Sequence, residues 1–280
     1  MSNFGGARVL ALENRRAKEM ASLISTYGGQ PLMAPAMREV ALDSNTEAVH
    51  FLSALLGGEF DMVIFLTGVG TRSLAVIADT TMAREQFAAA LRRVRVVARG
   101  PKPTAALKEL GVTVNVNVPE PNTWRELLAA LDRELPAPAM RGLRVAVQEY
   151  GAPAAELLAG LQERGAVVTR VPVYRWALPD DLGLLRSAIQ SLVAGEVGAA
   201  IFTTSVQVAH LFQVAAEMRQ EEPLRLGLRR CVIASIGPTT SEELQRRGLK
   251  ADLEASHPKM GVLVKEAADG YAELSAGKKG

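Results

Sequence analysis

The sequence predicts an α/β protein with two similar parallel-sheet lobes, and three observations support this prediction. Apolar runs alternate with helical patterns along the whole chain, which indicates parallel sheets covered by helices. A set of motifs from the first half recurs in the second half. The length of 280 residues suits two domains of ordinary size.

The predicted strands are short apolar runs, and the segments between them have helical spacing. The strand candidates are residues 7–12, 60–67, 94–98, 112–116, 143–147, 166–174, 199–202 and 231–236. Helical patterns such as 14–28 and 104–111 lie between them. Left-handed caps are expected where such patterns end, at Gly28, Gly111, Gly165 and Gly248. The proline-containing segment 135–140 is interpreted as a linker between the two halves.

The internal repeat relates the two halves by a nearly constant shift in position. Four residues of the first half have counterparts 137 positions later (237 minus 100): Gly100, Pro101, Leu107 and Gly111 correspond to Gly237, Pro238, Leu244 and Gly248. The same shift aligns residues 63–77 with 200–214, and a shift of 136 aligns 7–20 with 143–156. The chain is therefore interpreted as a diverged duplication of one unit of roughly 140 residues.

Composition excludes several classes of function. The net charge is only +2, and no basic run marks a nucleic-acid-binding surface. The one cysteine, Cys231, lies in an apolar run, so we expect core packing, with a reactive thiol as the alternative. Because the three histidines are isolated and there is one cysteine, no metal site is expected. Without a signal peptide or an apolar stretch of about 18 residues, we expect a cytoplasmic protein.

Two extended, proline-containing segments occupy equivalent places in the repeat, and we expect them to bridge the lobes. The predicted bridging strands are 35–41 and 170–178. Lobe 1 then comprises 1–34 plus 179–270, lobe 2 comprises 42–169, and 271–280 is expected to be a disordered tail. Open α/β sheets bind ligands beyond the carboxyl ends of their strands, so a cleft between the lobes is the expected active site.

The turn after the strand at 231–236 reads Gly-Pro-Thr-Thr and precedes a helical pattern. The amides of a helix start and the adjacent hydroxyls of Thr239 and Thr240 can bind an anionic group. Alternatively, one of these threonines only caps the helix. The sequence leaves both interpretations open.

Several motifs in order resemble the uroporphyrinogen-III synthase family along nearly the whole chain. The first is G-x-x-T-x-x-x-L-x-x-x-G at Gly237, Thr240, Leu244 and Gly248. The others are TGVGT at 67–71, ARGPKP at 98–103, QEYG at 148–151, VPVYR at 171–175 and FTTS at 202–205.

The resemblance implies a HemD-like fold: two lobes with flavodoxin-like layering, a two-stranded linker and an active-site cleft between the lobes. It implies cyclisation of hydroxymethylbilane, with loss of water and inversion of ring D, to give uroporphyrinogen III in tetrapyrrole biosynthesis. It further implies no metal and no cofactor, a monomer, and a transient contact with hydroxymethylbilane synthase. No nucleic acid or membrane partner is expected.

The resemblance also assigns site residues. Tyr174 and Thr240 are the catalytic candidates; Tyr174 would donate a hydrogen bond to the leaving hydroxyl, or else be a half-buried aromatic residue. The substrate-binding candidates are Arg15, Thr67, Gly68, Thr71, Arg99, Gly100, Lys102, Arg175, Thr203, Thr204, Ser205, Gly237 and Thr239. The turn after the first strand departs from the family pattern, so Arg16 is an alternative to Arg15. Gly237→Val is expected to block its turn.

Two other functions stay open. Two α/β lobes also suit a non-catalytic small-molecule binding or sensor module. A nucleotide-dependent enzyme would use the glycine turns at Gly68 or Gly100, although GVGTRS at 68–73 matches a dinucleotide fingerprint only in part.

Overall fold

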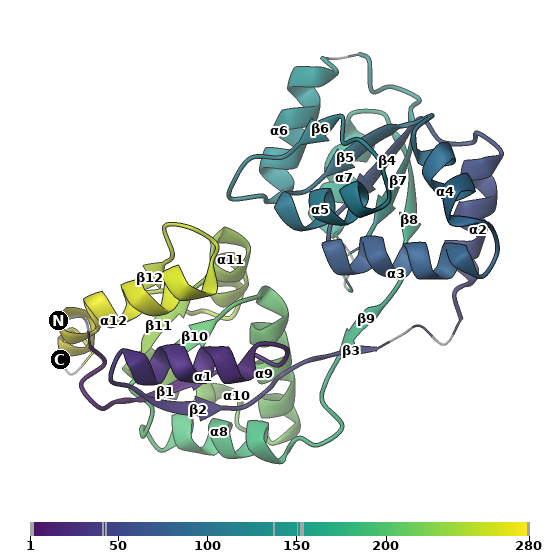
Figure 1. Cartoon of the computed structure of the whole chain (residues 1–280). Helices are drawn as coiled ribbons and strands as arrows, with labels where there is room; N and C mark the ends of the chain where they lie inside the picture. Colours follow the sequence, from purple (N-terminus) through teal and green to yellow (C-terminus); the bar gives the residue numbers. More distant parts are fainter. Residues whose placement is uncertain are drawn as a thin grey trace. The chain divides into compact units, whose positions relative to one another are not determined.

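The computed structural model describes residues 3–40, 42, 44–136, 138–149, 151 and 154–278. The chain divides into two compact units, each with its own five-stranded sheet (Figure 1). Unit 1 consists of Met1–Arg38 and Ala177–Gly280, and unit 2 of Glu39–Trp176.

Unit 1 is built around a sheet with the strand order β12-β11-β10-β1-β2, and all neighbouring strands pair in parallel. Its strands are β1 (Arg8–Ala11), β2 (Gln30–Met33), β10 (Ala199–Phe202), β11 (Val232–Ser235) and β12 (Leu253–Glu254). Its helices are α1 (Ala17–Thr26), α8 (Gly183–Val193), α9 (Ser205–Glu217), α10 (Glu221–Arg230), α11 (Pro238–Arg246) and α12 (Met260–Ala276).

Unit 2 has a sheet with the order β6-β5-β4-β7-β8, again with parallel neighbours. Its strands are β4 (Met62–Phe65), β5 (Arg95–Ala98), β6 (Val116–Asn117), β7 (Arg144–Gln148) and β8 (Val167–Val171). Its helices are α2 (Thr46–Leu56), α3 (Gly68–Asp79), α4 (Arg84–Leu91), α5 (Pro101–Glu109), α6 (Trp124–Glu134) and α7 (Ala155–Glu163). The segment 135–140, expected to link the halves, lies inside this unit between α6 and β7.

The two sheets correspond strand by strand, with β12, β11, β10, β1 and β2 matching β6, β5, β4, β7 and β8. The register agrees as well. Met62 pairs with Arg95 in unit 2, and their counterparts in the repeat, Ala199 and Val232, pair with each other in unit 1. Numbered along the chain within each unit, the orders are 2-1-3-4-5 and 3-2-1-4-5. The units are therefore circular permutations of one arrangement, and the prediction of two similar parallel α/β lobes is confirmed.

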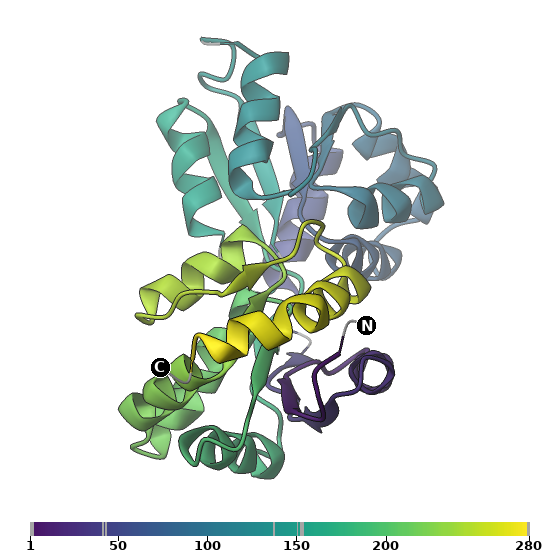
Figure 2. The same cartoon turned by 90° about the vertical axis from the view of Figure 1, so that its left-hand side faces the viewer.

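Both faces of each sheet are covered by helices, which explains why the strands are continuous apolar runs. In β4, Val63 and Phe65 pack in one core cluster and Met62 and Ile64 in another. Strand β1 alternates in the same way, with Leu10 on the face of α8 and α9. Its opposite face packs against α1 and against α12, the yellow helix in Figure 2.

A two-stranded ladder of β3 (Arg38–Val40) and β9 (Arg175–Ala177) lies where the chain passes between the units. The unit boundaries fall within these strands. Both strands lie inside the expected bridging segments 35–41 and 170–178, and Ala41 lies outside the described residues. The predicted two-stranded linker is confirmed.

The prediction of a disordered tail at 271–280 is wrong for its first part, because α12 continues to Ala276. Tyr271 packs edge to face against Phe4, with 5.6 Å between the ring centroids. Lys278 Nζ lies 2.8 Å from Asp252 Oδ2. The apolar residues of this segment continue the buried face of the helix at helical spacing. Lys279 and Gly280 lie outside the described residues.

The expected helix caps are confirmed, since Gly28, Gly111, Gly165 and Gly248 all have positive φ, between 67° and 83°.

Cys231 is 1% exposed, and burial raises the pKa of its thiol to about 12. Core packing of Cys231 is therefore confirmed. Within the described part of the chain, no helix is both long and apolar enough to cross a membrane.

Candidate functional site

The strand orders locate a ligand-binding edge in each unit. Connections leave the sheet in opposite directions between β4 and β7 in unit 2, and between β1 and β10 in unit 1. Ligands of open α/β sheets bind beyond the carboxyl ends of the strands at this reversal. The residues that follow these strands are therefore the first candidates in each unit.

In unit 2, Thr67 follows β4 and begins the next helix. Its backbone is extended (φ −144°), and its Oγ1 accepts a hydrogen bond from Gly70 N at 3.0 Å, so it is the N-cap of α3. The same oxygen lies 3.4 Å from the hydroxyl oxygen of Tyr174. The N-terminus of α3 and the hydroxyl of the predicted catalytic Tyr174 are thus in contact through Thr67.

The ring of Tyr174 is held firmly. The residue is 4% exposed, and its ring stands edge to face against Trp176 with 5.3 Å between centroids. Gly151 has φ +84°, and a Cβ there would lie 2.5 Å from Tyr174 Cε2. Trp176 N donates to Gly151 O at 3.0 Å. These contacts fix the position of the Tyr174 hydroxyl beside Thr67.

Two buried polar residues at the end of β7 complete this edge, and sequence reasoning did not select them. Gln148 is fully buried, and its Oε1 accepts from Thr67 N at 3.4 Å. A Cβ on Gly70 would collide with its carboxamide, so a side chain at position 70 would force Gln148 to move. Glu149 is 3% exposed and accepts two hydrogen bonds from Arg170, at 2.8 and 3.0 Å. These bonds raise the pKa of the Arg170 guanidinium.

The glycine turn after β5 lies next to this helix start. Arg99 N donates to Phe65 O at 3.0 Å, which places the turn beside the end of β4. Gly100 has φ +105°, a conformation that favours glycine. A Cβ on Gly68 would lie 2.6 Å from the Lys102 carbonyl oxygen, so the starts of α3 and α5 are in close contact.

The remaining candidates of unit 2 differ in accessibility. Lys102 and Arg175 are exposed. Thr71 is fully buried, and its hydroxyl donates to Thr67 O at 2.7 Å. The Thr71 side chain therefore stabilises the first turn of α3 rather than being presented at the surface.

In unit 1, the turn after β10 repeats the arrangement around Thr67. Thr204 is extended (φ −164°) and caps α9 by accepting from Val206 N at 3.4 Å. Thr203 Oγ1 donates to Glu13 Oε2 at 2.8 Å and accepts from Gln207 Nε2 at 2.9 Å. Gln207 is 1% exposed. Ser205, the first residue of α9, is half-buried. The carboxyl edge of β1 and β10 is thus a closed polar network.

The turn after β11 corrects one expectation. Gly237 has φ 163°, which is extended backbone that any residue adopts, and an added Cβ would have no atom of the described residues within 4 Å. A Cβ at 237 therefore meets open space, so the expectation that Gly237→Val blocks the turn is wrong as far as its Cβ is concerned. Thr239 is exposed whereas Thr240 is 2% exposed, so Thr239 presents the hydroxyl at this helix start.

The two arginines after β1 differ in their surroundings. Both are exposed. Arg16 Nε donates to Glu19 Oε2 at 2.7 Å, and this hydrogen bond raises the pKa of Arg16. Arg15 directly precedes Arg16 in the loop between β1 and α1, two residues after Glu13.

The structure therefore gathers the candidates at two edges. Thr67, Gly68, Arg99, Gly100, Lys102, Tyr174 and Arg175 belong to unit 2, and Arg15, Thr203, Thr204, Ser205, Gly237, Thr239 and Thr240 to unit 1. The repeat held a signal for the missed acids, because Glu13 and Glu149 are counterparts under the shift of 136 (149 minus 13) and both follow a switch-point strand. Within the described ranges, no cluster of three or more His, Cys, Asp or Glu side chains is placed to hold a metal ion.

These features define a two-unit α/β protein with polar, helix-capping turns beyond the carboxyl ends of both sheets. The chain belongs to the uroporphyrinogen-III synthase HemD family, whose model matches residues 18–265. This membership places it among the lyases of porphyrin biosynthesis.

Individual relatives agree with this assignment. The chain is 28% identical to a crystallised mutant of the uroporphyrinogen III synthase of Thermus thermophilus, with a TM-score of 0.75 over 95% of this chain and 99% of that one. It is 32% identical to a Methanothermobacter thermautotrophicus protein named "Putative uroporphyrinogen-III synthase", over 84% of this chain and 87% of the relative. It is 31% identical to "Uncharacterized protein YjjA" of Bacillus subtilis, over 96% of this chain and 97% of that protein.

Proposed function

We propose that the protein converts hydroxymethylbilane into uroporphyrinogen III, with loss of water and inversion of ring D. Family membership supports the reaction class. The observation that carries the assignment to particular residues is the 3.4 Å approach of the Tyr174 and Thr67 hydroxyl oxygens at the switch point of unit 2.

The first step breaks the bond between the terminal methylene carbon and its hydroxyl oxygen. The oxygen leaves as water, and the electron pair of the adjacent pyrrole nitrogen replaces the broken bond as that nitrogen loses its proton, which forms an azafulvene. A hydrogen bond from Tyr174 to the departing oxygen would assist this step. Thr67 lies within reach to accept from or donate to Tyr174, so the phenol keeps its orientation when the substrate leaves.

The azafulvene carbon is then attacked by the substituted carbon of ring D, which gives a spiro-pyrrolenine. Its fragmentation and renewed closure invert ring D. The pyrroles supply the electrons for these steps, so the protein mainly has to hold the bilane in the reactive conformation. We assign no strong nucleophile to the chain.

The substrate is a polyanion, and both sheet edges offer partners for its carboxylates. Helices α3, α5, α9 and α11 begin at these edges, where their first amides lack partners within the helix. Arg15 in unit 1 and Lys102 and Arg175 in unit 2 are exposed cations of the same turns or the adjoining strand β9. We propose that they bind acetate and propionate groups by charge-assisted hydrogen bonds.

The deciding experiment generates hydroxymethylbilane in place, adds the purified protein, oxidises the products and separates the porphyrin isomers. Spontaneous closure gives isomer I, so the reaction without protein is the control. Predominant isomer III supports the proposal. Isomer I alone, from protein with a cooperative unfolding transition, would overturn it and favour the binding or sensor module.

Three accompanying expectations stay predictions: a cytoplasmic location, a monomeric state, and a transient contact with hydroxymethylbilane synthase. Sedimentation with and without that enzyme tests the last two together.

A further inference from the structure

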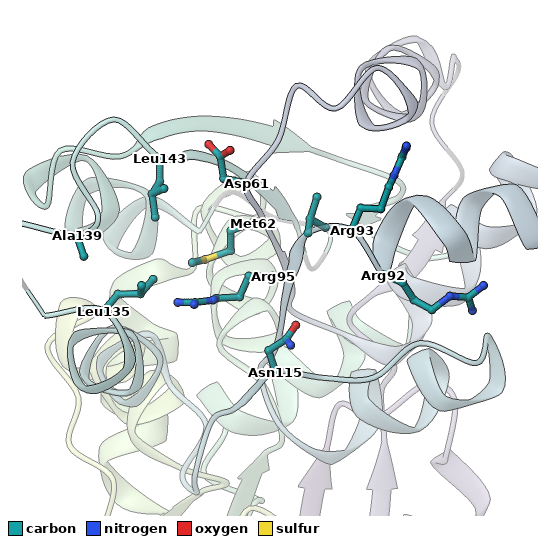
Figure 3. A pocket seen from close by; sticks show the side chains of 10 residues that line it. Asp61, Met62, Arg92, Arg93, Arg95, Asn115, Leu135, Ala139 and Leu143 are labelled. Carbon is teal, nitrogen blue, oxygen red and sulfur yellow. The ribbon is translucent and has the colours of Figure 1, made fainter.

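A pocket with a volume of about 390 Å³ lies at the amino-terminal edge of the unit 2 sheet, the edge opposite to Thr67 and Tyr174 (Figure 3). Met62 at the start of β4, Arg95 at the start of β5 and Leu143 before β7 line it. Leu135 and Ala139 from the loop after α6 contribute further apolar surface. The proposed reaction uses none of these residues.

Arg95 brings a guanidinium with one unsatisfied nitrogen to this pocket. Its Nη1 is buried and has no hydrogen-bond partner among the described residues. Figure 3 shows its side chain extending toward Met62 and Leu135, away from Arg92 and Arg93. A buried guanidinium nitrogen without a partner is costly, because it has lost its water and gained nothing in exchange.

The acid that lines the pocket, Asp61, is paired with Arg144. Both oxygens of Asp61 accept hydrogen bonds from Arg144, at 2.8 Å from its backbone N and at 2.8 and 3.1 Å from its guanidinium. Asn115 Oδ1 accepts from Val96 N at 2.7 Å, so Nδ2 is its remaining polar group and is a donor. The pocket lining is thus mostly polar, with donors and a cation, and Met62, Leu135, Ala139 and Leu143 add apolar side chains to it.

At the same location in unit 1, the charged side chain has a partner of opposite charge. The counterpart of Asn115 is Asp252, whose Oδ2 accepts from Ile233 N at 2.8 Å in the same geometry. Asp252 pairs with Lys278 at 2.8 Å. At the register position of Arg95, unit 1 has Val232, which is fully buried.

Unit 2 therefore differs from its own duplicate at three positions of this location. It has Asn115 where unit 1 has Asp252, Arg95 where unit 1 has Val232, and Asp61 where unit 1 has Gly198. In unit 1, the carboxylate of Asp252 is paired with Lys278. In unit 2, the buried Nη1 of Arg95 has no hydrogen-bond partner in the part of the chain that the structure describes. Because β11 forms with a buried valine, Val232, at this register position, a strand at this place in the sheet can form without an arginine.

We propose that the pocket binds a carboxylate carried on an apolar body, with Arg95 as the partner of the carboxylate and Met62, Leu135 and Leu143 around the apolar part. Arg95 and the amide of Asn115 provide the donors. This is a second binding site, separate from the edge that carries Tyr174.

Isothermal titration calorimetry with 4-phenylbutyrate tests the proposal on the full-length protein. Two further titrants are 4-phenylbutyramide, which has the same body without charge, and inorganic phosphate, which has charge without the body. The variant is Arg95→Met, which keeps an apolar side chain where unit 1 has valine. The matched control is Arg93→Met, because Arg93 lines the same pocket but its side chain points away.

We expect saturable binding of 4-phenylbutyrate to wild type and Arg93→Met, and binding weaker by about tenfold or more for Arg95→Met. We also expect the melting temperature of ligand-free Arg95→Met to equal or exceed that of wild type, which shows that it folds. Equal binding by Arg95→Met, equal binding of the amide, equal binding of phosphate, or no binding at millimolar concentration would each overturn the proposal.

Discussion

The hydroxyl oxygens of Thr67 and Tyr174 lie 3.4 Å apart, although the residues are 107 positions apart in the chain. Thr67 caps α3, and Tyr174 follows the last strand of the same sheet. The contact therefore joins a helix start to a buried phenol at the switch point of unit 2. It is the basis of the first prediction.

Tyr174→Phe should lower turnover to isomer III by about tenfold to a hundredfold, because the hydrogen bond to the departing oxygen is lost. Stability should fall by only about 1 kcal/mol, since the ring and its contact with Trp176 remain. Single-turnover assays and urea denaturation measure the two effects. Tyr271→Phe is the matched control, because it removes a phenol of α12 in unit 1. Wild-type rates for Tyr174→Phe would remove this tyrosine from the mechanism.

Gly100→Ala should destabilise the protein by about 1 to 2 kcal/mol, whereas Gly237→Ala should leave its stability within about 0.5 kcal/mol of wild type. The two glycines are counterparts in the repeat, but Gly100 has φ +105° and a Cβ there would lie 2.6 Å from Asn122 Oδ1. Gly237 is extended, with open space around it. Chemical denaturation of both variants measures the difference.

The turnover of Gly237→Ala gives a further test, because it reports whether the turn after β11 contacts substrate. A large loss of turnover without loss of stability would indicate that the open space at this turn receives substrate. Equal destabilisation of the two variants would contradict the geometry described for the turns.

Cys231 should resist alkylation in the native protein. The thiol is 1% exposed, and burial raises its pKa to about 12, so almost no thiolate is present at pH 8. Iodoacetamide labelling followed by intact mass should show no adduct until urea unfolds unit 1. Rapid labelling in native buffer would show that the thiol of Cys231 is accessible and would revive the reactive-thiol alternative.

Asp61→Asn should reduce the free energy of unfolding at pH 7, and the difference from wild type should shrink below about pH 4. Hydrogen bonds from Arg144 lower the pKa of Asp61. A carboxylate with a lowered pKa stabilises the fold above its unfolded pKa, and this contribution is lost as pH falls through the folded pKa. Because both side chains are more than a third exposed, the effect at pH 7 should not exceed about 1 kcal/mol. Urea denaturation at pH 7, 5, 4 and 3 gives the profile, and a constant difference down to pH 3 would contradict it.

The fold could be predicted from the sequence because its signals are local or repeated. Runs such as 62–65 are short and apolar on both faces, which is typical of a parallel strand covered on both sides. Because a nearly constant shift relates the two halves, predicting the strands of one sheet also predicted those of the other. The tail was missed because its apolar residues, including Tyr271, are widely spaced and are recognisable as a helix face only beside Phe4.

The site was predictable only in part. The turns at Thr67 and Thr204 stand out because hydroxyls follow apolar strands, and both cap helices. Gln148 belongs to the QEYG motif, but neither it nor Gln207 was predicted as a site residue, since the burial of a carboxamide is recognisable only by what surrounds it. Accessibility was also beyond the sequence: Thr239 and Thr240 are neighbours, yet one is exposed and the other buried.

The permuted strand order has a consequence for synthesis on the ribosome. Every strand of unit 2 lies within one continuous stretch of chain, so its sheet can form as soon as that stretch has emerged. Strand β1 must wait for β10, because Val9 pairs with Ala199 and the whole of unit 2 is encoded between them. Strands β1 and β2 are therefore made before unit 2 but join the rest of their sheet only after the whole of unit 2 has been made.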